Sequence, residues 1–263
     1  MGRIKVFVAG AAGKMGREVI KAVAADKELE LVGAADMKLH GTDAGELAGI
    51  EALGIKISEF SPEVLKMTGA QVLVDFTAPH SVLKNAKLAL QNKVRPVIGT
   101  TGLSEADLAE IRALAADSGA FVAPNFATGA ILMMRFAQEA ARYFPNVEII
   151  ELHHDQKLDA PSGTGLKTAE LISTVRPEFN QGHAEEYEKL PGARGGNYQG
   201  LRIHSIRLPG LVAHQEVIFG GLGQTLSIRH DAYSRETYMP GVLLAIKNVV
   251  TLNGLVVGLE NIM

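Results

Sequence analysis

The sequence predicts an α/β protein in which a parallel sheet covered by helices is followed by a separate region of clustered strands. Short apolar strands alternate with amphipathic helices through the first half, which is typical of a parallel sheet with helices on both faces. The strand-like runs of the second half lack long helices between them, which favours antiparallel or mixed pairing. A chain of 263 residues, 47% of them hydrophobic, is long enough for one or two domains with a large core.

The first half reads as strands and helices in alternation. Its strands are expected at Ile4–Ala9, Leu29–Ala35, Gln71–Phe76, Pro96–Ile98 and Ala120–Ala123. Its helices are expected at Lys14–Ala25, Ser81–Gln91 and Glu105–Ser118. The last two helices open with residues that can cap a helix, His80-Ser81 and Ser104. This order predicts right-handed crossovers between parallel strands.

The second half changes character near residue 128, where we place a domain boundary. Helices are expected at Ala130–Tyr143, Gly165–Val175 and Met239–Leu252. Strands are expected at Val147–His153, Leu201–Leu208, His214–Phe219 and Gln224–His230. Residues 176–200 are polar and glycine-rich, which predicts a loop.

The composition excludes several classes of protein. The 26 Lys and Arg against 29 Asp and Glu leave a net charge of −3, which argues against a broad nucleic-acid surface. The absence of Cys excludes a disulfide scaffold, thiolate metal sites and a Cys nucleophile. The sequence contains neither a signal-peptide pattern nor an apolar run long enough to span a membrane. We therefore expect a cytoplasmic enzyme without membrane or nucleic-acid partners.

A glycine-rich turn at Gly10–Gly16 is the first candidate binding motif. Its G-x-x-G-x-x-G spacing is a variant of the dinucleotide fingerprint, and it lies between a strand and a helix. Small residues let the backbone approach a pyrophosphate, and the helix start offers N–H groups and a positive dipole end. The turn alone is also compatible with a plain strand–helix connection, so the prediction depends on its position after a strand, before a helix and at the start of the chain.

Asp36 and Lys38 are the candidates for contacts to the cofactor ribose. Asp36 lies 20 residues beyond Gly16 at the end of the second strand, where an acid can bond the ribose hydroxyls of NAD(H). A strand-end capping Asp is the alternative interpretation. Lys38 could accept the 2′-phosphate of NADP(H), or could be an ordinary surface lysine. The sequence is therefore compatible with the use of both NADH and NADPH.

Two further loops follow predicted strands, Gly99–Gly102 (GTTG) and Pro124–Phe126 (PNF). Ligands of open parallel sheets bind outside the carboxyl ends of the strands, so both loops are expected at the same edge as the glycine turn. Alone, the GTTG segment is better explained as a turn with a helix cap.

Glu151–Thr164 (ELHHDQKLDAPSGT) holds the densest group of chemically active residues. His153, His154 and Lys157 are followed by a Pro-Ser-Gly-Thr turn that opens a helix. The N–H groups of Gly163 and Thr164 can bind an anion there, and the nearby cations indicate an anionic substrate with a proton-transfer step.

A metal site and a serine nucleophile are less favoured interpretations of this segment. It lacks an H-E-x-x-H pattern, and adjacent histidines cannot place both rings on one helix face. Ser162 lacks a nucleophile elbow and is expected to cap the helix. The other histidines except His80 are expected to be structural: His40, His183, His204, His214 and His230.

Taken together, the motifs resemble those of the dihydrodipicolinate reductase family. They occur in the family's order: GAAGKMG at 10–16, DFT at 75–77, GTTG at 99–102, PNF at 124–126 and HHDQKLDAPSGT at 153–164. The last segment is highly specific, and the resemblance runs from end to end. It implies NADH- or NADPH-dependent reduction of 4-hydroxy-tetrahydrodipicolinate to tetrahydrodipicolinate with loss of water, in lysine and diaminopimelate biosynthesis.

The resemblance also implies domains and residue roles. Residues 1–128 and 235–263 would form a Rossmann-type dinucleotide-binding domain, and 129–234 an α+β domain with a mixed sheet for substrate binding and tetramerisation. His153 would donate or accept a proton, Lys157 would be the general acid, and His154, Gly163 and Thr164 would bind the dicarboxylate substrate. The implied cofactor residues are Gly10, Ala11, Ala12, Gly13, Lys14, Met15, Asp36, Lys38, Gly99, Thr100, Thr101, Ala123, Pro124, Asn125 and Phe126.

Two alternatives stay open from the sequence. One is another two-domain dehydrogenase, such as one that reduces a semialdehyde. The other is a catalytically silent protein that senses NAD(P)H. Met37 lies between Asp36 and the nearest cation, Lys38, where some family members carry Arg directly after the acid. The sequence therefore leaves the preference between NADH and NADPH undetermined.

Overall fold

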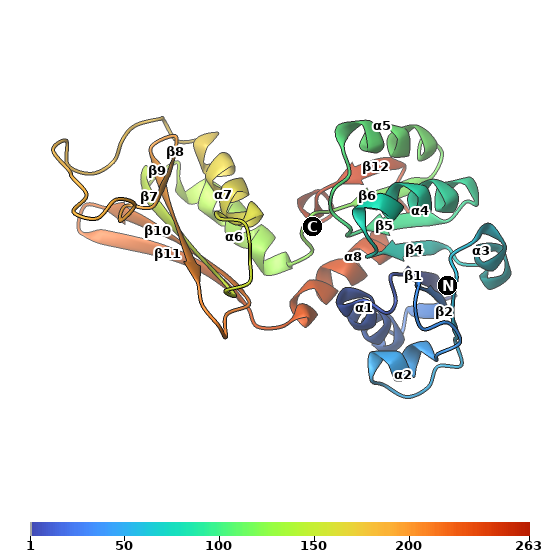
Figure 1. Ribbon diagram of the computed structural model, residues 1–263. Helices are drawn as coiled ribbons and strands as arrows, with labels where there is room; N and C mark the ends of the chain where they lie inside the picture. The colour runs from blue at the N-terminus through green and yellow to red at the C-terminus, as the bar shows by residue number, and fades with distance from the viewer. Residues whose placement is uncertain (1) are drawn as a thin grey trace. The chain divides into compact units, whose positions relative to one another are not determined.

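The computed structural model describes residues 2–263 (Figure 1). Met1, the first residue of the predicted nucleotide-binding domain, lies outside the described residues. The chain divides into two compact units, one made of Met1–Thr128 with Tyr238–Met263 and the other of Gly129–Thr237. The end of the chain thus returns to the first unit.

The first unit is built on a seven-stranded sheet in the order β12-β6-β5-β4-β1-β2-β3, and every pairing is parallel. The strands are β1 (Ile4–Ala9), β2 (Leu29–Ala35), β3 (Ile57–Ser58), β4 (Val72–Asp75), β5 (Arg95–Ile98), β6 (Gly119–Val122) and β12 (Gly254–Val257). The helices are α1 (Lys14–Ala25), α2 (Ala44–Ala48), α3 (Pro62–Thr68), α4 (Pro79–Gln91), α5 (Glu105–Leu114) and α8 (Met239–Val249). This arrangement confirms the predicted parallel α/β fold.

Helices cover both faces of this sheet because the strands bury apolar side chains on both sides. Successive side chains of a strand point to opposite faces. Phe7 and Ala9 join a core with side chains of α3 and α4, and Val6 and Val8 are equally buried. Helices α1 and α8 pack against each other, α1 against β1 and β2, and α8 against β4, β5 and β6.

The structure corrects one predicted helix cap and confirms another. Helix α4 begins at Pro79, before His80-Ser81, and its N-cap is Ala78, whose side chain cannot accept a hydrogen bond. Proline at the first helical position needs no N–H partner and already has a helical φ, which explains the earlier start. Helix α5 does begin with Ser104, in a reciprocal capping box with Asp107.

Other differences concern short elements. The sequence prediction lacked α2, β3, α3 and β12, and it continued α5 to Ser118, whereas α5 ends at Leu114. Two-residue β3 and five-residue α2 are too short to show a hydrophobic period. They are held by contacts to the remainder of the unit, such as the pairing of Ala34 with Ile57.

The second unit is a five-stranded mixed sheet with two helices on one face. Its strand order is β11-β10-β7-β9-β8; β7 and β9 are parallel, and the other neighbours are antiparallel. The strands are β7 (Asn146–His153), β8 (Gly196–Tyr198), β9 (Leu201–Arg207), β10 (Ala213–Gly221) and β11 (Gln224–Ala232). Helix α6 spans Thr128–Ala140 and α7 spans Gly163–Ser173. The mixed sheet confirms the fold predicted for this region, and β8 adds a strand to the predicted loop.

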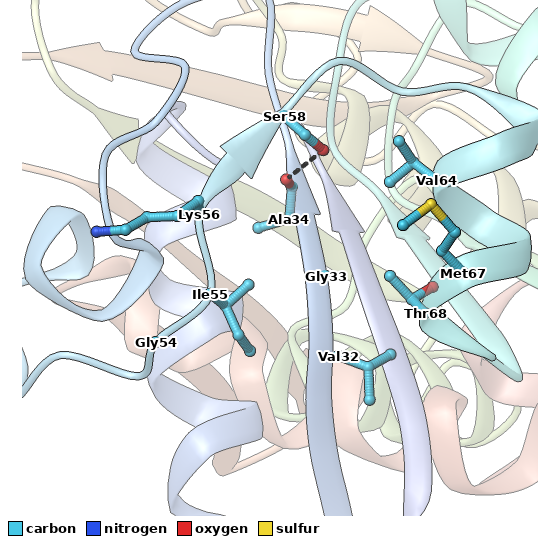
Figure 2. Close-up of a pocket in the computed structure, with 10 residues that line it drawn as sticks. All are labelled: Val32, Gly33, Ala34, Gly54, Ile55, Lys56, Ser58, Val64, Met67 and Thr68. Carbon is cyan, nitrogen blue, oxygen red and sulfur yellow. Dashed lines mark hydrogen bonds between the residues drawn. The ribbon is translucent and has the colours of Figure 1, made fainter.

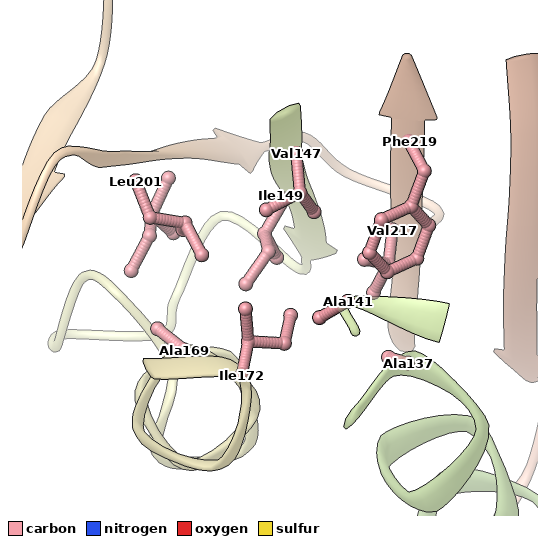
Figure 3. Close-up of a cluster of buried hydrophobic side chains, with 10 residues drawn as sticks. Ala137, Ala141, Val147, Ile149, Ala169, Ile172, Leu201, Val217 and Phe219 are labelled. Atoms are coloured by element: carbon pink, nitrogen blue, oxygen red, sulfur yellow. The ribbon is translucent and has the colours of Figure 1, made fainter. Parts of the chain in front are cut away.

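The core of the second unit lies between the helices and the sheet. Val147, Ile149, Val217 and Phe219 point from the strands toward Ala137 of α6, Ala141 just after it, and Ala169 and Ile172 of α7 (Figure 3). Since alternate residues of β7 face this core, Glu151 lies on the same face as Val147 and Ile149. Strand β7 is therefore well packed along its length, up to the end that carries Glu151 and His153.

Candidate active site

The glycine turn after β1 is shaped by contacts that exclude side chains. Gly10 has φ +81°, and a Cβ there would lie 2.4 Å from the carbonyl oxygen of Phe76. A Cβ on Gly16 would lie 2.1 Å from the carbonyl oxygen of Gly10. Gly13, the N-cap of α1, has no side chain with which to cap the helix. This arrangement fits a pyrophosphate at the start of α1, where backbone N–H groups and the helix dipole attract an anion.

Asp36 is brought to this turn across 24 residues of sequence. Its Oδ2 accepts a hydrogen bond from Ala12 N at 2.9 Å, and its Oδ1 accepts one from Lys38 N at 3.0 Å. The Nε2 of His40 lies 2.7 Å from the Asp36 carbonyl oxygen. Lys38 itself is exposed. A carboxylate directly after β2 thus lies beside the turn, where the sequence predicts a contact to the cofactor ribose.

A buried carboxylate that the sequence analysis gave no role joins the loops after β4 and β5. Asp75 is fully buried and accepts hydrogen bonds from Thr77 Oγ1 and Thr100 Oγ1, each at 2.7 Å, and from Asn85 Nδ2 at 2.8 Å. Thr100 was predicted to line the cofactor, and its hydroxyl holds the GTTG loop to β4. Thr101, the next residue, is exposed.

The PNF loop combines core and surface residues. Phe126 is buried, and its ring centroid lies 5.7 Å from that of Phe76 and 5.9 Å from that of Phe121. Ala123 is buried as well, whereas Pro124 is exposed. The side chains of Phe126 and Ala123 thus belong to the core, so any contact of theirs with a cofactor would be made by the backbone.

The end of β7 carries a second buried carboxylate, Glu151. It is 0% exposed, and His153 Nδ1 lies 2.5 Å from its Oε2. Arg207 of β9 binds both carboxylate oxygens, with Nη1 2.9 Å from Oε2 and Nη2 2.8 Å from Oε1. Burial raises the pKa of Glu151, but the hydrogen bonds from His153 and Arg207 outweigh it and lower that pKa to about 2. Glu151 is therefore ionised at neutral pH.

The same carboxylate reaches the start of α7. Ser162 N donates a hydrogen bond to Glu151 Oε1 at 3.2 Å. The Ser162 hydroxyl accepts from Gly165 N at 3.0 Å, which confirms the predicted cap. A Cβ on Gly163 would meet nothing within 4 Å, so the first residue of the helix faces open space. His153 and the predicted anion-binding turn are thus both hydrogen-bonded to the Glu151 carboxylate.

Lys157 lies in the loop between β7 and α7. Its Nζ is 2.7 Å from Asp159 Oδ1, and this hydrogen bond is the largest cause that lowers the pKa of Asp159. Arg207 Nη2 donates to the Asp159 carbonyl oxygen at 2.8 Å and so ties the loop to β9. His154 is exposed in the same loop. The unit therefore brings His153, Lys157 and the start of α7 to the end of one strand.

Sequence reasoning missed Glu151 and Arg207, for different reasons. Glu151 belongs to the segment Glu151–Thr164 described above. Residues two apart on a strand share a face, so the sequence did contain a signal for the pairing of Glu151 with His153. Arg207 had none, since it lies 56 residues from Glu151. Two predicted structural histidines have carboxylate partners: His204 lies 2.7 Å from Glu148, and His214 lies 2.7 Å from Asp231.

A cavity of about 310 Å³ lies elsewhere in the first unit (Figure 2). It is lined by residues of β2, β3 and α3 and of the segment before β3, among them Val32, Ala34, Ile55 and Met67. None of its lining residues belongs to the predicted site. Within residues 2–263, no cluster of three or more potential ligands could hold a metal ion, and no helix could cross a membrane.

The parallel sheet with its glycine turn is the fold of Rossmann-type nucleotide-binding proteins, the class that includes the oxidoreductases that use a pyridine nucleotide, and the second unit supplies a cluster suited to proton transfer. The family descriptions "Dihydrodipicolinate reductase, N-terminus" and "Dihydrodipicolinate reductase, C-terminus" match residues 4–126 and 129–263. The chain belongs to the dihydrodipicolinate reductase family, which confirms the resemblance seen in its motifs.

Individual relatives match along the whole chain. A 4-hydroxy-tetrahydrodipicolinate reductase of Desulfitobacterium hafniense is 62% identical over 264 residues, covering 99% of each chain. One of Moorella thermoacetica is 55% identical over 263 residues, covering 99% of this chain and 98% of the relative. The solved structure of a dipicolinate-bound dihydrodipicolinate reductase from Paenisporosarcina sp. TG-14 is 48% identical with a TM-score of 0.90, covering 99% of this chain and 100% of that one.

Proposed function

We propose that this chain reduces 4-hydroxy-tetrahydrodipicolinate to tetrahydrodipicolinate, with NADH or NADPH, in lysine and diaminopimelate biosynthesis. The observation that carries the proposal is the cluster at the end of β7, where Glu151 joins His153 to the start of α7 and Lys157 lies in the connecting loop. The names of relatives that are 62% and 55% identical supply the substrate. We also propose the cytoplasm as the compartment of this reaction.

The reaction needs an anion site and a source of protons. The 4-hydroxyl leaves as water with a proton from the neighbouring carbon, a hydride adds at carbon 4, and one proton is returned to that neighbouring carbon. We assign proton transfer to His153 and Lys157, since a general acid typically contributes about 10²–10⁴-fold to such a step. We assign one substrate carboxylate to the N–H groups of Gly163 and Thr164, and further contacts to His154. A dipicolinate-bound relative supports a dicarboxylate ligand.

The reduced nicotinamide supplies the hydride when it is bound. The residues fit such a cofactor, since the glycine turn leaves the start of α1 without a side-chain cap and Asp36 lies against Ala12. We propose that the turn binds the pyrophosphate and that Asp36 binds the ribose of NADH. Lys38 is the cation that would accept the 2′-phosphate of NADPH.

A coupled absorbance assay tests the function. The upstream synthase condenses pyruvate with aspartate semialdehyde, and this chain is then added with NADH or NADPH in separate runs. We expect the reduced-nicotinamide absorbance to fall only when the synthase product is present, and the two rates to rank the cofactors. A folded chain that binds NADH or NADPH but consumes neither would overturn the proposal.

We also propose a homotetramer assembled through the second unit. Helices α6 and α7 cover one face of its sheet, and the other face carries the partly exposed side chains Ile150, Leu152, Ile206 and Ile218. Covering such a row removes apolar area from water, which stabilises an assembly. Light scattering should give a mass of four chains of 28.0 kDa, and a mass of one chain would contradict the assembly.

A further inference from the structure

We propose that Glu151, held by Arg207, is a positioning residue that keeps His153 in the Nδ1–H tautomer and thereby leaves Nε2 as the nitrogen that transfers the proton. The inference rests on the proposed function, because it explains how that reaction's proton-transfer group is prepared. It adds roles for two residues, of which Arg207 lies outside every motif discussed above.

The tautomer follows from the chemistry of the carboxylate. An ionised carboxylate only accepts hydrogen bonds, so the ring nitrogen that contacts it must carry a hydrogen. The contacting nitrogen is His153 Nδ1, 2.5 Å from Glu151 Oε2. In the neutral ring, Nε2 then carries the lone pair, and in the protonated ring it carries the transferable proton.

Arg207 keeps the carboxylate ionised and in place. Glu151 is 0% exposed, and a buried charge requires a partner. The two guanidinium hydrogen bonds, at 2.9 and 2.8 Å, supply that partner in the bidentate geometry that best fixes a carboxylate plane. Rotation of the carboxylate away from His153 would break them.

The same two residues align the rest of the cluster. Glu151 accepts from Ser162 N at the start of α7, and Arg207 donates to the carbonyl oxygen of Asp159, the residue that pairs with Lys157. The imidazole of His153, the start of α7 and the loop that carries Lys157 are therefore all hydrogen-bonded to one buried ion pair. We infer that this pair sets the distance between the proton-transfer group and the substrate carboxylate site.

The chain contains a matched control on the opposite face of β7. Glu148 contacts His204 Nε2 at 2.7 Å and Arg194 Nη2 at 2.7 Å, which is again a glutamate between a histidine and an arginine. The Glu148 side chain is 30% exposed, whereas that of Glu151 is 0% exposed. Glu148→Gln therefore removes the same chemistry away from the candidate site.

The kinetic test compares Glu151→Gln in two backgrounds, the otherwise unchanged chain and His153→Ala. A glutamine amide can donate as well as accept, so it no longer selects one tautomer. In the unchanged background, Glu151→Gln should lower kcat by about tenfold or more, with KM for substrate and NADH changed by less than about threefold. In the His153→Ala background, it should lower kcat by less than about twofold, because the ring whose tautomer it selects is gone and the glutamine carbonyl oxygen can still accept from Ser162 N.

Glu148→Gln should leave kcat within about twofold, with the assembly mass checked by light scattering. Should Glu151→Gln fail to fold, Arg207→Lys takes its place, because it keeps the charge and loses the bidentate contact. An equal loss of kcat in both backgrounds, or no loss in the first, would overturn the proposal.

The spectroscopic test needs no substrate. Nitrogen-15 NMR of labelled histidine distinguishes the two tautomers, and the His153 signal is identified by its loss in His153→Ala. We expect the Nδ1–H form in the unchanged chain and a mixture in Glu151→Gln. The Nε2–H form in the unchanged chain would overturn the proposal. The Nδ1–H form in a chain without turnover would instead refute the proposed function and leave the tautomer standing.

Discussion

The carboxylates that contact His153 and Lys157 differ in how deeply they are buried. His153 contacts a buried carboxylate, whereas Lys157 contacts Asp159, whose side chain is 62% exposed. An exposed ion pair contributes little to stability, so Lys157 can exchange Asp159 for a substrate group at small cost. Such an exchange suits the role of general acid proposed for Lys157.

Lys157→Ala should lower turnover by at least about tenfold, because the proposed general acid is lost. Its affinity for NADH should stay nearly unchanged, since the predicted cofactor residues lie in the other unit. Steady-state rates and a fluorescence titration of NADH check both parts. Lys167→Ala, which removes a surface lysine paired with Glu170 on α7, is the control. A large loss of NADH binding in Lys157→Ala would count against the assignment.

Asp36 and Lys38 should separate the two cofactors. Asp36→Asn removes the charge that we propose binds the ribose hydroxyls of NADH, and hydrogen bonds to charged groups are worth about 1.5–3 kcal/mol. We expect about ten- to a hundredfold weaker NADH binding with a smaller effect on NADPH, since the carboxylate repels a 2′-phosphate. Lys38→Ala should weaken the binding of NADPH and leave the binding of NADH unchanged. Equal effects of either substitution on both cofactors would refute these roles.

Among the elements, α4 and α5 show two ways to begin a helix beside the site. Helix α5 uses the capping box of Ser104 and Asp107, and α4 uses Pro79. The Ser81 hydroxyl donates to the carbonyl oxygen of Ala78 and does not cap the helix. A serine near a helix start therefore has an effect that depends on its position relative to the first turn.

Ser104→Ala should lower the free energy of unfolding by about 1 kcal/mol, the usual cost of a lost N-cap. Ser81→Ala should change it by less than about 0.5 kcal/mol, because no N–H of α4 depends on that hydroxyl. Urea unfolding of both variants provides the comparison. The reverse order of the two effects would mean that α4 begins at Ser81 after all.

In the molecule as a whole, the Glu151 pair links stability to pH. Its folded pKa of about 2 lies below the ordinary 4.5, so the carboxylate favours the folded state wherever it is ionised. This contribution is complete above about pH 4.5 and is lost as the pH falls toward about 2. A difference of that size corresponds to roughly 3 kcal/mol.

Calorimetry between about pH 2 and pH 7 should therefore show a shallower acid decline of Tm for Glu151→Gln than for the unchanged chain. The variant should be less stable near neutral pH, because Arg207 loses its charged partner, and the two curves should approach each other in acid. Curves that stay parallel over this range would show that Glu151 titrates normally in the folded chain.

Local patterns determined much of this protein. The strands at Ile4–Ala9 and Leu29–Ala35 and the helix at Lys14–Ala25 were predicted residue for residue, because an apolar run, a glycine turn and a helical period each lie within one short window. The motif segments likewise located the loops after β1, β5, β6 and β7. The family, the α/β class and the mixed second sheet follow from these patterns together.

Tertiary structure decided the parts that depend on partners distant in the chain. Strand β3 exists because β2 offers a free edge, and β12 exists because α8 returns the chain beside β6. Arg207 reaches Glu151 only because β9 lies parallel to β7 in a register that sets Arg207 opposite His153. A hydrogen bond or a buried charge depends on which strands become neighbours, and no local period of the sequence contains that information.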